Sequence, residues 1–210
     1  MKKNDAMPWW GWLAWMVTAA LGALAYFHLP AEVVGKGGHA APRLLVVSYE
    51  PALTLFVILL WHGLWKIDPK RRNYGDFWPT YRYIGGVIVS CVSLTYLVVL
   101  GHVFGLGSMR LIPTAIGVMF MLIANVSPRI RPNWWVGFRT PWTLSSEESW
   151  NRTHRLAGQL GIPAGLLVVV LAWTLPLGVA MRLAILVPVL LWVATAFVAS
   201  YFYAKGANRR

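Results

Sequence analysis

Residues 83–104 read YIGGVIVSCVSLTYLVVLGHVF, and they contain no lysine, arginine, aspartate or glutamate. A helix needs about 20 apolar residues to cross the hydrocarbon core of a bilayer, so this stretch predicts a transmembrane helix. Similar apolar stretches occupy residues 9–27, 44–65, 111–126, 156–175 and 181–203. The sequence therefore predicts an all-α, polytopic membrane protein with six transmembrane helices.

The composition supports this fold class. Apolar residues make up 58% of the 210 residues and charged residues only 12%, whereas soluble proteins carry about 25% charge. A core of this size cannot bury so much apolar surface, so the excess is expected to face membrane lipid. The net charge of +12 does not indicate direct nucleic-acid binding, because the basic residues lie in short segments between apolar stretches.

The distribution of lysine and arginine predicts the orientation. Fifteen of the 19 basic residues lie in the N-terminus, the second and fourth loops and the C-terminus, and four lie in the other loops. Positive charge is retained on the cytoplasmic side, so both termini are expected in the cytoplasm (N-in, C-in). Eleven of the 13 tryptophans lie on or near that side, which is typical of an interfacial aromatic belt.

The second and fourth loops begin alike. Residues 68–74 read Asp-Pro-Lys-Arg-Arg-Asn-Tyr, and residues 127–134 read Ser-Pro-Arg-Ile-Arg-Pro-Asn-Trp. Duplication of a two-helix unit would explain this pattern, and so would chance similarity between short basic loops. We expect two units: residues 1–82 with two spans and a basic loop, and residues 83–210 with four spans and a long cytoplasmic loop at 127–155.

The fourth loop contains a turn suited to binding an anion. Gly137 and Pro141 bracket Arg139 and Thr140. The turn would present a guanidinium beside a hydroxyl, a combination that can bind a phosphate or a carboxylate. The alternative is a rigid surface loop that only closes the cytoplasmic end of the bundle.

A helix is expected to follow this turn. Ser145 and Glu148 have the spacing of a capping box, so the helix should begin there and continue into the fifth span. Glu148 and Arg152 are spaced for an i,i+4 ion pair. We expect the loop to fold against the inner ends of the spans, with Trp142 and Trp150 buried at the interface.

The same region carries a long motif. It reads Gly137-Phe138-Arg139-Thr140-Pro141-Trp142-Thr143-Leu144, followed by Glu148, Trp150, Thr153-His154-Arg155 and Gly158. This pattern, within residues 133–158, resembles the SdpI family of bacterial membrane proteins, and the six-span layout fits that family. Many members carry a Pro-Thr-His element after the first span. Here residues 28–35 read His-Leu-Pro-Ala-Glu-Val-Val-Gly, and that element is missing.

The resemblance implies a function. The founding member of the family protects a cell from a secreted toxic peptide that collapses the membrane potential, and it signals the toxin by holding a cytoplasmic repressor at the membrane. It therefore implies an immunity protein of the bacterial inner membrane. We expect no enzymatic activity and no cofactor, because an enzyme would need converging titratable groups and Glu50 is the only acid within the predicted spans. The implied partners are membrane lipid, a peptide toxin and a cytoplasmic repressor.

The fourth loop is the expected working surface. Arg139 is predicted to anchor an anion, Glu148 to cap and pair within the helix, and His154 to make a polar contact beneath them. The full set of expected ligand- or partner-binding residues is Asn133, Gly137, Arg139, Thr140, Pro141, Trp142, Thr143, Glu148, Trp150 and His154.

The outer side offers a weaker alternative site. Glu50 is the only acid within the predicted spans, and His28, His39 and His102 share its outer side. Two or three histidines and one carboxylate could ligate zinc, although their spacing matches no local metal motif. We therefore predict no metal site.

Two further functions compete with immunity. Pro163 and Pro188 interrupt two predicted spans, and broken helices are typical of transporters, so a small transporter is the second candidate. A membrane-embedded lipid-handling enzyme or a partner subunit is the third.

Overall fold

The computed structural model describes residues 5–34 and 39–207. The helices are α1 (Trp9–Tyr26), α2 (Arg43–Leu64), α3 (Tyr74–Val103), α4 (Leu111–Val126), α5 (Pro141–Ser145), α6 (Glu147–Thr174) and α7 (Leu177–Ala207). Two short 3-10 helices, η1 (Arg71–Asn73) and η2 (Ser127–Arg129), lie within the loops at one end of the bundle. Strands β1 (Glu32–Val34) and β2 (Ala40–Pro42) pair antiparallel, with Val33 opposite Ala41.

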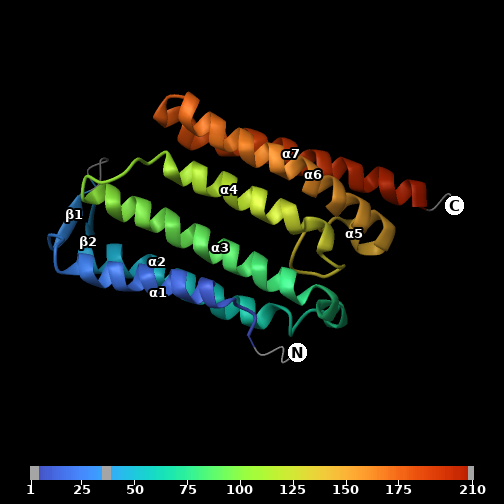
Figure 1. Cartoon of the computed structure of the whole chain (residues 1–210), viewed down its shortest axis with the longest axis horizontal. Coiled ribbons are helices and arrows are strands. Elements are labelled where there is room, and N and C mark those ends of the chain that lie inside the picture. Colours follow the sequence, from blue (N-terminus) through green and yellow to red (C-terminus); the bar gives the residue numbers. More distant parts are fainter. Residues whose placement is uncertain (1–4, 35–38, 208–210) are drawn as a thin grey trace.

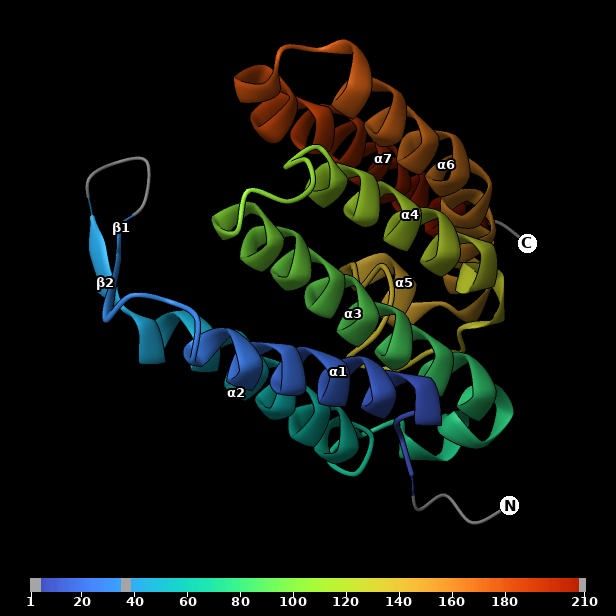
Figure 2. The same ribbon diagram turned by 60° about the vertical axis from the view of Figure 1, so that its left-hand side comes forward.

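The long helices lie side by side along one axis (Figures 1 and 2). The pair α1 and α2 forms one side, α3 and α4 the middle, and α6 and α7 the other side. The β1–β2 hairpin lies at one end of the bundle, while the start of α1, α5 and the end of α7 lie toward the opposite end. An even number of crossings would place the two termini on the same side of a membrane.

The chain is a multi-pass membrane protein. Helices α2, α3, α4, α6 and α7 are long and apolar enough to cross a bilayer. Large apolar side chains stay exposed along them, such as Phe56 at 60%, Leu166 at 54% and Leu191 at 62%, which is the surface a lipid environment requires. The all-α membrane fold predicted from the sequence is thus confirmed.

Helix α1 is not among the helices that are long and apolar enough to cross a bilayer. The count of six spans therefore stays a prediction. Helix α1 has 18 residues, of which four are tryptophans, and the indole N–H makes tryptophan less apolar than leucine or valine. It nevertheless packs along α2 and α3. Its Leu13, Val17 and Leu24 are exposed at 46%, 41% and 58%, as a lipid-facing helix would be.

Glycines bring α4 and α6 into close contact. A Cβ atom added at Gly165 would lie 2.5 Å from the carbonyl oxygen of Gly117, and one added at Gly117 would lie 2.7 Å from the carbonyl oxygen of Gly165. Gly161 and Gly165 are spaced as in the small-xxx-small motif of membrane helix pairs. Helices α6 and α7 run continuously through Pro163 and Pro188, so the predicted interruptions are wrong.

Helix α3 is longer than its predicted span. Helix α3 begins at Tyr74, nine residues before the predicted span, because Asp76, Pro79 and Arg82 conceal its first turns from a hydropathy reading. The predicted boundary between residues 82 and 83 therefore lies inside a helix, and the two-unit division stays a prediction. The β1–β2 hairpin lies between the first two predicted spans, where the sequence predicts no element.

The orientation can be tested by cysteine labelling. Glu32 on β1 and Arg72 on η1 are both exposed and lie in segments at opposite ends of the bundle. With the N-in, C-in orientation, an impermeant thiol reagent added to intact cells should label Glu32→Cys but not Arg72→Cys. The native Cys91 is buried and should contribute little background. Labelling of Arg72→Cys before the cells are opened would contradict the predicted orientation.

Candidate functional site

Asp68 joins the two loops that begin alike. We call residues 65–73 loop two and residues 127–146 loop four. The Asp68 side chain is 4% exposed. Its Oδ2 accepts hydrogen bonds from the Tyr74 hydroxyl at 2.7 Å and from the backbone N–H of Trp134 at 2.9 Å, and its Oδ1 accepts from the Lys70 N–H at 2.7 Å. One buried carboxylate thus connects loop two, α3 and loop four.

Two further hydrogen bonds join the same loops. The Asn73 amide donates to the carbonyl of Pro132 at 2.7 Å, and the Lys70 ammonium donates to the carbonyl of Leu144 at 3.1 Å. Loops two and four therefore form one folded unit, which we call the loop pair. The similar residues that begin each loop contact one another across this unit.

Asn133 holds the first turn of loop four. It is fully buried, its amide donates to the carbonyls of Arg131 and Val136, and its Oδ1 accepts from the N–H groups of Trp135 and Val136. All of these partners are within loop four. The structure therefore gives Asn133 a role in shaping the loop, and its polar atoms are already occupied by the backbone.

Gly137 and His154 form the centre of loop four. Gly137 has φ +109°, and a Cβ there would lie 2.2 Å from His154 Nε2. That nitrogen accepts a hydrogen bond from the Phe138 N–H at 3.0 Å, while Nδ1 lies 2.9 Å from the Trp150 carbonyl. These partners assign the neutral tautomer with the proton on Nδ1. The imidazole is fully buried and stacks on the Trp150 ring at 4.2 Å between centroids.

A capping box forms at Thr140, not at Ser145. The Thr140 hydroxyl accepts from the Thr143 N–H at 3.1 Å, and the Thr143 hydroxyl accepts from the Thr140 N–H at 2.9 Å, with Pro141 at the first position of α5. Helix α6 begins at Glu147 and is capped by Ser146, whose hydroxyl accepts from the Ser149 N–H. The predicted box at Ser145 and Glu148 is therefore wrong, because Ser145 lies in the last turn of α5.

Other expectations for α6 are confirmed. The helix runs without a break from the loop into the membrane-spanning part. Arg152 lies 3.2 Å from the Glu148 carboxylate, as the i,i+4 spacing predicted. Trp150 is fully buried and donates its indole N–H to the Ile130 carbonyl at 2.8 Å. Trp142 of α5 was also expected to be buried, but it is only half-buried, with its ring against Phe197 and Tyr201 of α7.

Hydroxyl contacts dock loop four and the first turn of α6 on α7. The Thr140 hydroxyl lies 2.9 Å from the Ser200 hydroxyl, and the Ser149 hydroxyl donates to the Ser200 carbonyl at 2.9 Å. All three residues are buried. Loop four is thus a folded element held by α3, α6 and α7, as expected from its local signals.

Arg139 lies on the surface of this element. Its guanidinium donates to the Trp134 carbonyl, and the side chain is exposed. Within residues 5–34 and 39–207 this is the one hydrogen bond of a side chain that carries five N–H donors. Arg139 as an anion anchor stays a prediction.

A polar cavity of about 610 Å³ opens between loops two and four. It contains two bases and two acids, Lys70, Arg131, Asp76 and Glu147. The rest of its lining is Asn73, Pro132, Thr143, Leu144 and Ser145. Of the predicted site residues only Thr143 lines this cavity. Most of the others either stabilise the fold of loop four or lie on the outer surface of that loop.

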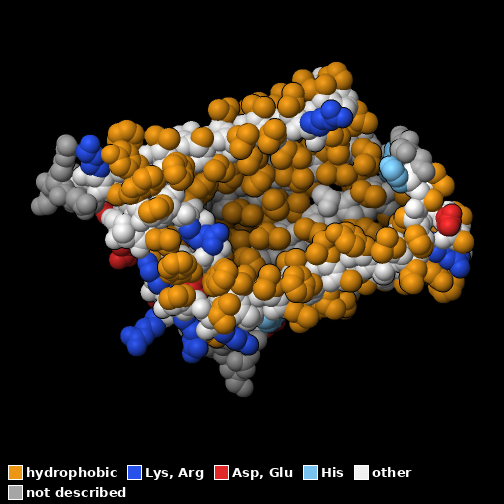
Figure 3. Space-filling view, turned by 180° about the vertical axis from the view of Figure 1, so that it is seen from behind, with side chains coloured by type: hydrophobic (Ala, Val, Ile, Leu, Met, Phe, Trp, Pro, Cys, Tyr) orange, Lys and Arg blue, Asp and Glu red, His pale blue; other side chains and the backbone are white. Residues whose placement is uncertain are grey.

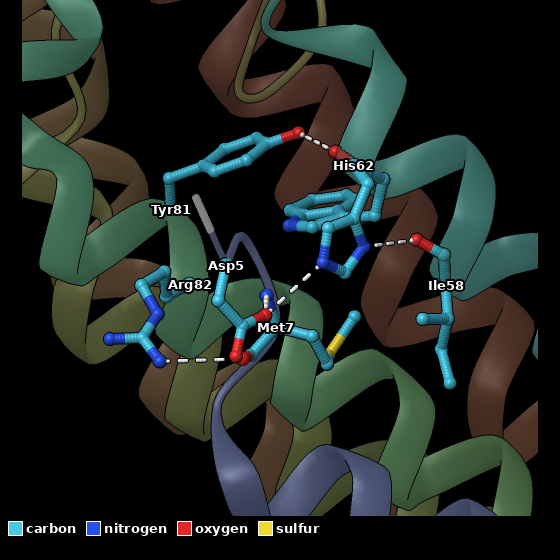
Figure 4. Close-up of polar contacts among 7 residues, drawn as sticks. Asp5, Met7, Ile58, His62, Tyr81 and Arg82 are labelled. Atoms are coloured by element: carbon cyan, nitrogen blue, oxygen red, sulfur yellow. Dashed lines mark hydrogen bonds and ion pairs between the residues drawn. The ribbon is translucent and has the colours of Figure 1, made fainter. Parts of the chain in front are cut away.

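Sequence reasoning also missed a polar cluster at the start of the described chain (Figure 4). Asp5 lies 3.1 Å from His62 Nε2, and Arg82 donates to the Met7 carbonyl at 3.3 Å. The Tyr81 hydroxyl donates to the Trp61 carbonyl at 2.6 Å. The first two contacts attach the segment before α1 to α2 and α3, and the third joins α3 to α2. Their partners are separated by up to 75 residues, so no local motif could reveal them.

No metal centre is assembled within residues 5–34 and 39–207, because no three histidine, cysteine or acidic side chains come together there. His28 Nδ1 bonds to the Leu24 carbonyl and Glu50 to the Thr54 hydroxyl.

Known proteins are similar to this chain in the same regions. The model of the SdpI/YfhL protein family matches residues 129–201, which include most of loop four, α5, α6 and most of α7. The Immunity protein SdpI of Bacillus subtilis (strain 168) is 30% identical over 196 residues, which cover 88% of this chain and 89% of that protein. The chain belongs to the SdpI/YfhL family. No solved structure matches this family member.

The family model matches only one of the two segments that form the loop pair. All ten predicted site residues lie within the part matched by the SdpI/YfhL model, whereas Asp68, Lys70 and Asn73 of loop two precede it. The relative covers both loops, since its match extends over nearly the whole chain. The loop pair is therefore built from the family's characteristic segment and a second segment that the sequence motif did not include.

Proposed function

We propose that this chain is an immunity protein of the bacterial inner membrane that protects its host from a secreted, membrane-active peptide. The observation that carries the proposal is its near full-length similarity to the Immunity protein SdpI. The lipid-facing surface of its helices would place it where such a peptide acts. No step of this role requires bond chemistry, and the proposed role is non-enzymatic.

The loop pair is the proposed relay surface. It is a folded polar unit that contacts three helices, so a shift of the helices would be transmitted to it. Its cavity exposes basic and acidic groups to which a cytoplasmic protein, such as a repressor, could bind. Arg139 on the adjacent surface would add a planar guanidinium for a carboxylate or phosphate of that partner.

Expression in a naive bacterial host tests the protective role. Cells that produce the protein should keep their membrane potential, followed with a potential-sensitive dye, at doses of a potential-dissipating peptide that depolarise control cells. Deletion in the native host should have the opposite effect. Absence of protection, together with substrate flux in proteoliposomes, would contradict immunity and favour the small transporter.

The anion-anchoring role of Arg139 is tested by Arg139→Lys, which keeps the charge and loses the planar fork. We expect the variant to insert and fold normally but to hold less of the cytoplasmic partner at the membrane, measured by fractionation. Arg155→Lys is the matched control, because Arg155 is an exposed arginine of α6. Equal retention by both variants would mean that Arg139 needs only its charge.

A further inference from the structure

A second cavity lies in the membrane-spanning part of the bundle, between α2 and α3. It measures about 640 Å³, its lining is mostly apolar, and Ile112 of α4 lies at its edge. Figure 3 shows that the bundle is hollowed on the face seen from behind, between the α1/α2 side and the α6/α7 side, and that hydrophobic side chains cover the hollow. We call the cavity between α2 and α3 the α2–α3 groove.

Glu50 lines this groove and has an unused oxygen. Its side chain is 7% exposed, and its Oε1 accepts a hydrogen bond from the Thr54 hydroxyl at 2.5 Å. Its Oε2 is buried and has no hydrogen-bond partner in the described part of the chain. The neighbouring hydroxyls are already used: Tyr96 donates to the Val47 carbonyl and Thr95 to the Val92 carbonyl.

A buried carboxyl group with one free oxygen is unfavourable in either protonation state. As a carboxylate it lacks a donor for Oε2, and as an acid its own O–H lacks an acceptor. Intramembrane acids are rare for this reason, and they mark functional sites, among them sites where the acid pairs with the positive charge of a ligand. A molecule that brings a positively charged donor into the groove would satisfy Oε2 and neutralise the charge.

The depth of Glu50 distinguishes a peptide from a lipid. Glu50 is seven residues beyond Arg43, the first residue of α2, which places it about 10 Å along the helix from the hairpin end. At that depth a lipid offers acyl chain, whereas its amino groups lie at the surface. An apolar peptide can carry an amino group within its membrane-inserted segment.

We infer that the α2–α3 groove binds an apolar, membrane-inserted peptide segment and that Glu50 recognises an amino group on it. The groove supplies the apolar surface and Glu50 supplies the single complementary charge. This inference rests on the proposed function for the identity of the natural ligand, because a membrane-active toxin is a peptide of this kind.

A synthetic peptide tests the recognition directly. The probe is a leucine–alanine helix with one lysine at the depth of Glu50 and a fluorescent acceptor for tryptophan energy transfer. The full-length protein is reconstituted in phosphatidylcholine vesicles, and a peptide with norleucine in place of lysine serves for comparison. The lysine peptide should bind more tightly to the native protein, and Glu50→Gln should weaken it by about tenfold or more without affecting the norleucine peptide.

Matched variants test whether the changes in peptide binding arise in the groove or from a general effect of substitution. Glu32→Gln removes an exposed acid at the same end of the molecule and should leave binding unchanged. Val99→Trp fills the groove and should weaken both peptides, whereas Val170→Trp places the same bulk on an exposed position of α6 and should weaken neither. The inference is overturned if the lysine peptide does not bind the native protein in preference to the norleucine peptide, or if Glu50→Gln binds it as the native protein does.

The cellular assay distinguishes this inference from the proposed function. If cells that produce Glu50→Gln or Val99→Trp protein at native levels remain fully protected from the toxic peptide, immunity stands and the groove is not its binding site. If the native protein gives no protection but binds the lysine peptide through Glu50, the groove assignment stands and the immunity proposal fails.

Discussion

Replacing Gly137 with alanine is expected to destabilise the protein more than any other single methyl group added to loop four. The new Cβ would lie 2.2 Å from His154 Nε2, at a residue with φ +109°. The strained backbone and the loss of the buried histidine hydrogen bonds together should cost about 3–4 kcal/mol. Thermal unfolding in detergent micelles, followed by near-ultraviolet circular dichroism, would measure the loss.

Gly63→Ala is the control for this change. Gly63 lies in α2, and a Cβ there would meet no atom within 4 Å. Alanine should be tolerated at that position or stabilise the helix by up to about 1 kcal/mol. Equal melting temperatures for Gly137→Ala and the native protein would show that loop four can rearrange around His154, and the described geometry would then not be needed for stability.

Asp68→Ala is expected to separate loop two from loop four. The substitution leaves the buried Tyr74 hydroxyl and the Trp134 N–H without their acceptor, and it frees the Lys70 N–H. Loss of these charge-assisted hydrogen bonds should cost about 3 kcal/mol or more. Faster proteolysis within loop four, together with a lower unfolding temperature, would show that the loop pair has opened.

A graded series checks the cause. Asp68→Asn keeps one acceptor oxygen and should fall between alanine and the native residue. Asp76→Ala removes the same charge from an exposed position in the first turn of α3 and should change stability by less than about 1 kcal/mol. If Asp68→Ala and Asp76→Ala behave alike, the loop pair does not depend on the buried carboxylate.

The elements differ in how well local sequence predicted them. Helix α4 has the predicted bounds, Leu111–Val126, because Arg110 precedes its apolar stretch and a Ser-Pro turn follows it. The start of α3 was missed because its first turns do not form a continuous apolar stretch. They are stabilised by the aromatic core around Tyr74, Phe77 and Tyr81. Several tryptophans assigned to an interfacial belt, including Trp61 and Trp78, are buried in that core.

Within the candidate site, local motifs predicted the existence of structure better than its details. The turn, the helix and the Glu148–Arg152 pair of loop four follow from spacing along one segment. The cap was placed on the wrong serine because Ser145 and Ser146 are equally good caps, and the choice depends on where α5 ends. Nothing local indicated that the Trp134 carbonyl would bind Arg139. His154 was expected to make a polar contact beneath the loop, but its spacing did not indicate that the donor would be the Phe138 N–H.

The sequence alone determined that the chain is a helical membrane protein with its basic loops at one end. The length of an apolar stretch and the position of charges are local properties, and they decide directly which segments enter the bilayer. The sequence motif also determined the family. Only the tertiary structure decided that Asp68 bonds to Trp134 and that Glu50 keeps a free oxygen in an apolar groove. These features depend on which residues, distant along the chain, come within hydrogen-bonding distance when the helices pack.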